Sequence, residues 1–375
     1  MAHSLIKAIL FASLAGGSVA APAAADPLEW LGSNFIDPDD GALDVSAWLS
    51  RGGFFPVPVV VSEPAVDNGL GLVGVFVHGG DDEAGIPPDV SGGGAIFTGN
   101  SSSVYVGFHQ GSYLGDRLRY FGAIGDASVN LDTFPGSSGT GFGFNVDGLF
   151  SLQNVRYRVA DSDVFAGARW TYLDSSVKFD AFNAPAGENP NSDIRLSGLG
   201  ASLYYDTRDN IFTTTEGINA RALVTFYDNK IGSDFDFVEL DLTGLFFHSP
   251  FEKWNLSAKA EVSMIFGDAP FFAEPFIQLR GIPALRYQGE AVVSTEVELR
   301  RDISPRWSVL GFAGVGFAGS DGVGDFSDEG PQGVVGGGVR YNIARELGLL
   351  VGLDVAQGTE DTVVYLQFGH AFGID

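Results

Sequence analysis

The chain has 375 residues, of which 47 are acidic and 21 basic, so its formal net charge at pH 7 is −26. This charge argues against nucleic-acid binding, because phosphates require a basic face. The absence of cysteine excludes disulfides, thiolate zinc sites and cysteine nucleophiles. Glycine is abundant with 52 residues, and hydrophobic residues make up 45% of the chain, which is too apolar for a disordered protein.

Residues 1–25 have the pattern of a secretory signal peptide. Lys7 lies in a short basic segment, an apolar stretch runs from Ala8 to Leu14, and Ala23-Ala24-Ala25 offers a cleavage site. The apolar stretch is far shorter than the about 20 residues of a transmembrane helix. We therefore expect an exported protein whose mature chain begins at Asp26.

Residues 26–53 are acidic and too short to form a domain. We expect a periplasmic N-terminal arm that serves as a plug or a strap. Two acidic groups fit either solvated loops or weak binding of divalent cations, namely Asp37, Asp39, Asp40 and Asp44 in the arm and Asp321, Asp325, Asp328 and Glu329 further on.

Apolar and polar residues alternate with a period of two through much of 54–375. Val297 and Leu299, for example, alternate with Glu296 and Glu298. A period of two places the members of each set on one face of a β-sheet. The alternation therefore predicts an all-β region with one apolar face and one polar face.

A soluble sandwich and a membrane barrel both have these two faces. Three features favour the barrel: the segments are longer than the about 5–6 residues of globular strands, charges lie in mid-strand, and aromatic residues lie near segment ends. These aromatic residues include Trp170, Tyr172, Trp254 and Trp307. We predict a transmembrane antiparallel outer-membrane β-barrel over 54–375.

The alternation marks fifteen segments, one of which is long enough to hold two strands. Bacterial single-chain barrels have even strand numbers, so we expect about sixteen strands. The segments are 56–63, 69–79, 94–112 (the long one), 117–132, 141–159, 163–180, 192–208, 214–228, 235–249, 254–267, 290–303, 306–319, 331–343, 347–356 and 361–372. The longer connections, which suit surface loops, are 80–93, 181–191, 268–289 and 320–330, whereas tight ones such as 161–162, 304–305 and 344–346 suit periplasmic turns.

The last predicted segment resembles the C-terminal aromatic strand of outer-membrane proteins. Val364, Leu366, Phe368, His370 and Phe372 share one face of it. We therefore expect Phe368 and Phe372 to lie on the final strand.

Two further motifs carry a more specific resemblance. The first is a strand-turn motif made of Asp206, Thr207, Arg208, Asp209 and Asn210 with Gly217, and the second is Leu279, Arg280, Gly281 and Ile282 with Glu298 downstream. Together and in this order they resemble the bacterial surface antigen barrel. This superfamily comprises outer-membrane assembly and translocation proteins, including the barrel-assembly insertase and two-partner secretion transporters.

The resemblance implies a role for Arg280. In the family, the arginine of this motif lies at the tip of a long loop folded into the lumen and meets an acid on the barrel wall. Glu298 stands at the matching position, with Glu296 as the second candidate. The family's next strand carries an acid where this chain has Gly314, and Asp354 fits the family's penultimate strands only loosely.

The resemblance also implies an integral outer-membrane protein of a Gram-negative-type bacterium. The chain looks like a barrel-only member, because residues 26–53 cannot hold a periplasmic polypeptide-transport-associated domain. The function implied is assistance in inserting or transporting proteins or lipids, with outer-membrane lipid and a client polypeptide or lipid as partners. A passive pore or a structural, surface-interaction barrel is the alternative.

No motif points to catalysis, a cofactor or a metal. Gly69 to Gly74 match G-x-G-x-x-G, but strand rather than helix follows, and the five histidines have no metal-site spacing. We therefore expect no enzymatic activity and no cofactor. A set of arginines fits either a lumenal basic column that attracts anions or lumenal ion pairs, namely Arg156, Arg158, Arg195, Arg208, Arg221, Arg280, Arg286 and Arg300.

Overall fold

The computed structural model describes residues 35–49, 53–79, 88–133, 141–179, 191–210, 213–319, 330–369 and 372. The predicted signal peptide and the second acidic group lie outside these residues. Within them, no helix is long and apolar enough to span a membrane.

The described residues form sixteen antiparallel strands, as predicted. The strands are β1 (Gly53–Val61), β2 (Gly69–His78), β3 (Asp89–Thr98), β4 (Ser103–Tyr113), β5 (Leu118–Thr133), β6 (Phe142–Arg158), β7 (Val164–Phe179), β8 (Asn191–Asp206), β9 (Gly217–Tyr227), β10 (Phe237–Phe251), β11 (Trp254–Gly267), β12 (Ala291–Asp302), β13 (Trp307–Gly319), β14 (Gln332–Ala344), β15 (Leu349–Gln357) and β16 (Thr362–Phe368). Short helical turns are α3 (Ser46–Leu49), η1 (Pro64–Val66), η3 (Asn229–Ile231) and η4 (Phe271–Ala273). Segment 94–112 indeed contains two strands, β3 and β4.

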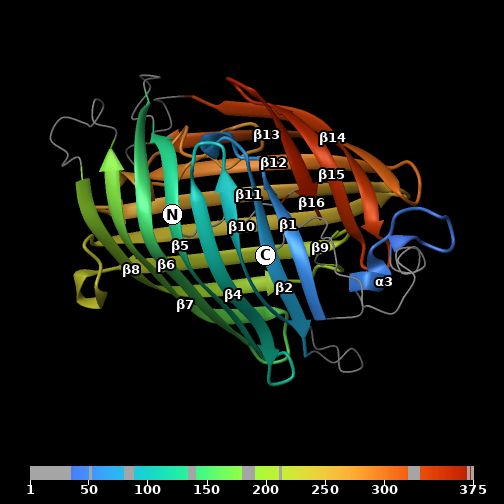
Figure 1. The fold of residues 1–375 in the computed structure, drawn as a ribbon, viewed down its shortest axis with the longest axis horizontal. Helices are drawn as coiled ribbons and strands as arrows, with labels where there is room; N and C mark the ends of the chain where they lie inside the picture. The colour runs from blue at the N-terminus through green and yellow to red at the C-terminus, as the bar shows by residue number, and fades with distance from the viewer. Residues whose placement is uncertain are drawn as a thin grey trace.

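Each strand pairs with the next one along the chain, so the sheet order runs from β1 to β16 (Figure 1). Among the described residues no ladder joins β16 back to β1. The two strands nevertheless meet, because the Leu366 N–H donates to the Ser62 hydroxyl over 3.3 Å. We call this junction of the first and last strands the seam.

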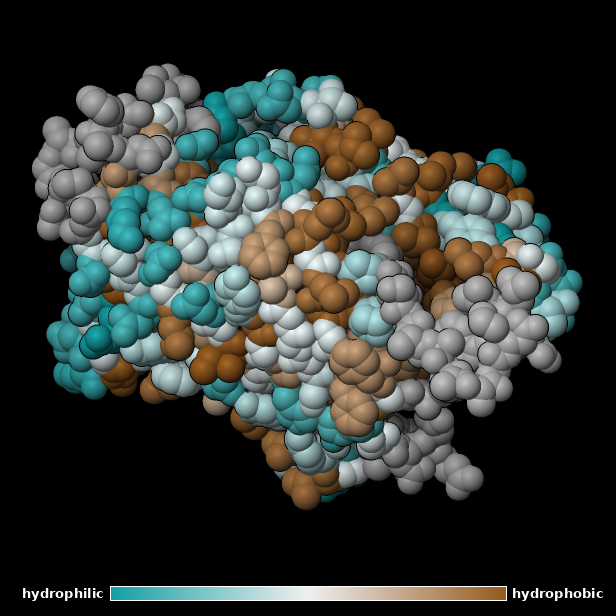
Figure 2. Space-filling view, viewed as in Figure 1, coloured by the Kyte–Doolittle hydropathy of each residue, from teal (hydrophilic) through white to brown (hydrophobic). Residues whose placement is uncertain are grey.

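The two faces of the sheet follow the predicted alternation. On β12, Val297 and Leu299 are 44% and 42% exposed, whereas Glu296 and Glu298 are 2% and 5% exposed. The apolar set therefore faces outward and the polar set faces the lumen. Figure 2 shows the result on one side of the barrel, with apolar residues over the middle and polar residues gathered at one end.

The two ends of the barrel differ in their connections. We call one the turn end, because it has short links such as 114–117, 252–253 and 303–306, and the other the loop end. Antiparallel strand order puts the link between β2 and β3 at the turn end, so the prediction of 80–93 as a surface loop is wrong. Counting 94–112 as one segment puts this link at the same end as the other long connections, and its division into β3 and β4 moves the link to the opposite end.

The last strand is shorter than predicted. Strand β16 ends at Phe368, and Gly369 turns the chain with a φ of +69°. Phe372 is therefore not on the strand, and its ring is buried 6.4 Å from that of Phe247 on the inner face of β10. The burial of an aromatic ring accounts for this inward turn.

The wall is uneven in length around the barrel. Strands β5 to β8 have 16 or 17 residues, whereas β1 has nine and β16 has seven. The barrel is therefore shortest beside the seam.

Candidate functional site

The long connection 268–289 between β11 and β12 folds into the lumen. Phe272, Ile277 and Leu285 in it are 4%, 1% and 0% exposed. Phe271 packs against the Phe144 ring of β6 at 4.9 Å. We call residues 268–289 the lumenal loop.

Arg280 lies at the tip of the lumenal loop, as the family resemblance implies. Its Nη1 donates to Glu298 over 2.9 Å. Its Nε and Nη2 donate to Glu296 over 2.9 and 2.6 Å. Both glutamates of β12 thus bind the guanidinium, and Glu296, the second candidate from sequence, accepts two of its hydrogen bonds through one oxygen, Oε1. We call Arg280 and its carboxylate partners the latch.

A third carboxylate in the latch comes from β15. Arg280 Nη1 donates to Asp354 over 2.7 Å, and Asp354 also accepts from Arg340 on β14 over 2.9 Å. Asp354 is fully buried. Asp354 is thus the third acid of the latch, and the loop is latched although position 314 is glycine.

Burial and charge act in opposite directions on the latch. Burial alone lowers the pKa of Arg280, but the charges of Glu296, Glu298 and Asp354 outweigh it and raise that pKa. The Phe312 ring lies under the guanidinium at 3.5 Å and contributes a cation–π contact. Arg280 therefore stays charged at any physiological pH.

The residues around Arg280 fix the tip in place. Leu279 and Ile282 are buried in one apolar cluster. Gly281 has a φ of +93°, and a Cβ there would lie 3.0 Å from the Gly358 nitrogen of the β15–β16 turn. Its N–H donates to the Tyr365 hydroxyl of β16 over 2.8 Å. Gly281 is thus required both for the backbone conformation and for the close approach.

The strand-turn motif forms the turn-end link between β8 and β9. Arg208 binds Asp206 through two hydrogen bonds of 2.8 and 2.7 Å. The Asp209 carboxylate accepts the Thr215 N–H at 2.9 Å. The Asn210 side chain donates to the Leu347 carbonyl of the β14–β15 link over 3.2 Å. The motif therefore builds a turn and ties two links at the turn end together.

Two residues of the motif hold its base at the start of β9. The Thr207 N–H donates to the Ile218 carbonyl over 2.9 Å. Gly217 has a φ of +121°, and a Cβ there would lie 2.4 Å from the Thr207 carbonyl oxygen. The glycine is therefore demanded by the turn itself.

The N-terminal arm is bound at the turn end by one arginine. Arg306, in the β12–β13 link, donates to Asp40, Asp44 and Asp37 over 2.7, 2.7 and 2.5 Å. This hydrogen bond from Arg306 lowers the pKa of Asp40 to about 2. The expectation of solvated loops or a cation site is wrong for these three aspartates, because a guanidinium occupies their centre.

One backbone hydrogen bond joins the arm to the C-terminal strands, and one aromatic contact joins it to β1. The Val45 N–H donates to the Ile343 carbonyl of β14 over 2.7 Å. In α3, Trp48 packs edge-on against Phe55 of β1 with ring centroids 4.8 Å apart. The arm therefore contacts strands on both sides of the seam at the turn end.

Most arginines of the predicted column form ion pairs with carboxylates. The pairs are Arg158 with Asp116, Arg195 with Asp174, Arg208 with Asp206, Arg280 with its three acids, Arg286 with Glu360 and Arg300 with Asp302. The ion-pair interpretation is therefore confirmed for these arginines, except that the Arg195–Asp174 pair is exposed on the outward face rather than in the lumen. The sequence analysis did not single out Arg169 or Arg306.

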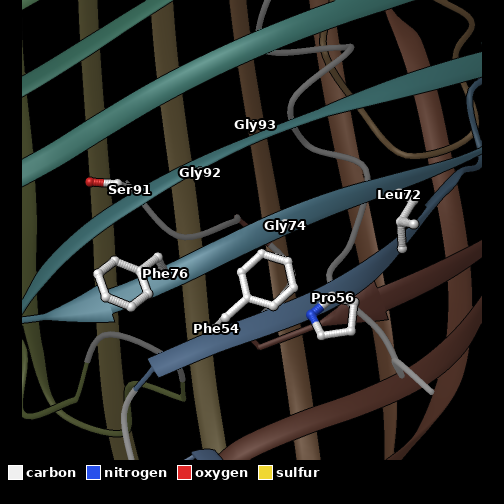
Figure 3. A pocket seen from close by; sticks show the side chains of 8 residues that line it. All are labelled: Phe54, Pro56, Leu72, Gly74, Phe76, Ser91, Gly92 and Gly93. Atoms are coloured by element: carbon white, nitrogen blue, oxygen red, sulfur yellow. The ribbon is translucent and has the colours of Figure 1, made fainter. Parts of the chain in front are cut away.

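A shallow hollow of about 560 Å³ lies on the outer face of β1 to β3. Figure 3 shows Phe54 and Phe76 side by side over it, with Leu72 at the far end. Gly74 and Gly93 are paired across β2 and β3 and leave its floor without side chains. The hollow belongs to the outward apolar face, and the Ser91 hydroxyl at its edge is hydrogen-bonded to His78 and His109. No group of three or more metal-ligating side chains occurs in the described parts of the chain.

By sequence, no family model and no curated protein matches the chain. By structure, it is similar to BamA from Haemophilus ducreyi lacking POTRA domains 1–3, with a TM-score of 0.60 and 12% identity over 85% of this chain and 69% of that one. It is also similar to CdiB from Escherichia coli (TM-score 0.61, 11% identity, 84% of this chain) and from Acinetobacter baumannii (0.54, 9%, 84%). The chain spans 62% and 59% of these CdiB proteins. The chain thus shares the barrel fold of these proteins.

Proposed function

We propose that this protein is an integral outer-membrane barrel that assists the insertion or translocation of proteins or lipids. The outward apolar face, with residues such as Leu242 and Phe246 exposed on β10, suits contact with lipid. The short links suit the periplasmic side, so the turn end faces the periplasm and the loop end faces outward. The partners are outer-membrane lipid and a client polypeptide or lipid.

The seam is the observation that carries this proposal. A transmembrane strand needs about 9–11 residues, whereas β16 has seven. Among the described residues no ladder joins β1 to β16, and two strands without a ladder between them are easier for an incoming strand to separate than two fully paired strands. A short wall also favours local thinning of the bilayer. An incoming client strand can thus pair with β1 or β16 at the place where the bilayer is thinnest.

The lumenal loop disfavours the alternative of a passive pore. Its buried aromatic residues and the latch occupy space that a wide channel would need. The latch joins β12 to β15, and Gly281 extends the contact to β16. The loop therefore supports the C-terminal side of the seam from inside the barrel.

The arm fits the role of a strap across the seam. It is bound by Arg306 on one side and contacts Phe55 of β1 on the other. In this proposal the arm limits how far the periplasmic end of the seam opens.

The proposal is tested by reconstitution. Purified protein in phosphatidylcholine vesicles should speed the folding of an unfolded eight-stranded barrel, scored by its faster migration on unboiled SDS gels. Vesicles with an unrelated, fully closed barrel are the control. Equal folding rates of the client in the two kinds of vesicle would contradict the proposed insertion activity. In cells, deletion should lower the abundance of other outer-membrane proteins.

A further inference from the structure

The inner wall opposite the seam carries a buried arginine that neither the latch nor the arm uses. Arg169 on β7 is 3% exposed. Its Nη2 donates to the Tyr204 hydroxyl over 3.3 Å. Its Nε and Nη1 have no hydrogen-bond partner among the described residues. Buried charged donors left without an acceptor are costly, so this guanidinium is poised for a further acceptor.

Two more guanidinium groups lie around the same tyrosine. Arg156 on β6 stands over the Tyr204 ring at 4.5 Å, and the strand register places Arg221 of β9 directly opposite Tyr204. The charges of Arg156, Arg169 and Arg221 all act on the Tyr204 hydroxyl. The Asn154 side chain also donates to that hydroxyl over 3.2 Å. Four consecutive strands thus direct positive charge and hydrogen-bond donors to one place.

The carboxylates of the neighbouring wall have other partners. Glu239 and Asp241 on β10 accept from Tyr227 and Ser263 over 3.3 and 2.7 Å. Glu239 and Arg169 lie at the same height in the sheet, because Arg169 pairs with Gly200, Gly200 with Thr225 and Thr225 with Glu239. Strands β8 and β9 therefore lie between them. Three strand spacings of about 4.8 Å separate the two backbones. Among the described residues, no carboxylate therefore hydrogen-bonds to Arg169.

We propose that Arg169, Arg156, Arg221 and the Tyr204 hydroxyl form a binding site for a phosphate-type oxyanion in the lumen. Guanidinium groups bind phosphate oxygens through paired N–H donors. A tetrahedral anion can accept donors arriving from several strands at once, and it would supply the missing partners of Arg169. A free phosphate and the phosphate of a lipid headgroup present the same chemistry. The site does not depend on the insertion activity proposed above.

The first experiment uses inorganic phosphate as the probe. Equilibrium dialysis of the detergent-purified barrel against radiolabelled phosphate, at constant ionic strength in chloride, should show saturable binding. The variant Arg169→Gln should bind roughly tenfold more weakly or worse, as expected for losing hydrogen bonds to a charged group. Tyr204→Phe, which keeps the ring, should weaken binding less.

A matched control separates this site from general surface charge. Arg195 is an exposed arginine paired with Asp174 at 3.5 Å, so Arg195→Gln should bind phosphate like the wild type. Faster migration of each unboiled variant on SDS gels verifies that the barrel is folded.

A second measurement distinguishes the two phosphate sources. Mass spectrometry of the purified barrel counts the phospholipid that it retains. A headgroup site predicts retained phospholipid that falls in Arg169→Gln and resists competition by inorganic phosphate, whereas a free-phosphate site predicts dialysis binding without retained lipid. If the wild type holds neither inorganic nor lipid phosphate more strongly than folded Arg169→Gln, the proposal is overturned.

Discussion

Arg280 in the lumenal loop donates a 2.7 Å hydrogen bond to Asp354, which lies 74 residues further along the chain on β15. The same carboxylate binds Arg340 of β14. One buried acid therefore connects the loop tip with two strands of the C-terminal wall. The seam side of the barrel is thus held from within by charge as well as by packing.

Removing Asp354 should destabilise the barrel strongly. Asp354→Asn leaves Arg280 and Arg340 without their shared carboxylate, and breaking a buried pair costs about 3–5 kcal/mol. Asp174→Asn, which breaks an exposed pair with Arg195, should cost about 1 kcal/mol or less. Urea-induced unfolding in lipid vesicles measures both. Equal, small losses would show that the latch does not stabilise the fold.

Arg280 and Glu298 should behave as one unit. Arg280→Ala and Glu298→Ala should each raise single-channel conductance, because the loop loosens in both. The double variant should be little worse than either, since residues in contact are not additive. The wild type should show small and irregular conductance. Fully additive losses in unfolding free energy, together with unchanged conductance, would contradict docking of the loop on this wall.

Gly281→Ala should detach the loop tip without removing any charge. A Cβ there meets the Gly358 nitrogen at 3.0 Å, on a backbone with a φ of +93°. Such strain costs about 1–3 kcal/mol. Gly333→Ala on β14 is the control, because nothing lies within 4 Å of its added Cβ. Thermal unfolding followed by the shift from the fast to the slow SDS-gel band compares the two variants.

The arm should stay bound at neutral pH and detach only in strong acid. The Arg306 hydrogen bond lowers the pKa of Asp40 from 3.8 to about 2. A lowered folded-state pKa stabilises docking above the free value, and this contribution is lost as the pH falls from about 4 to about 2. A nitroxide on Asp39→Cys, unique because the chain has no cysteine, reports arm mobility by electron paramagnetic resonance. In Arg306→Gln the label should already be mobile at pH 7. An immobile label there would contradict the conclusion that Arg306 holds the arm.

The strands and the two glutamates of the latch could be predicted, because the sequence pattern that indicates them is local. A period of two places Glu296 and Glu298 on the face opposite Val297 and Leu299, whatever the rest of the chain does. The strand number followed from the same alternation together with the even strand number of bacterial barrels, which placed two strands within 94–112. The position of the β2–β3 link did not, because it depends on strand parity over the whole barrel.

The rest of the site depends on contacts between distant segments. Nothing near Asp354 in the sequence indicates that it meets Arg280. The three aspartates bound by Arg306 looked solvated because their partner lies about 260 residues away, at separations of 269, 266 and 262. Arg169 is one of many lumen-facing polar residues, and only its buried, unpartnered nitrogen atoms single it out.

Restricting the seam tests the central claim most directly. Cysteines at Ser62 and Leu366, whose hydroxyl and amide lie 3.3 Å apart across the seam, can be joined by a short bifunctional thiol reagent. Leu242 and Val262, paired across β10 and β11, give a matched crosslink away from it. We predict that the seam crosslink abolishes stimulated client folding in vesicles and that the β10–β11 crosslink leaves it unchanged. Full activity with the seam crosslinked would contradict insertion through the seam.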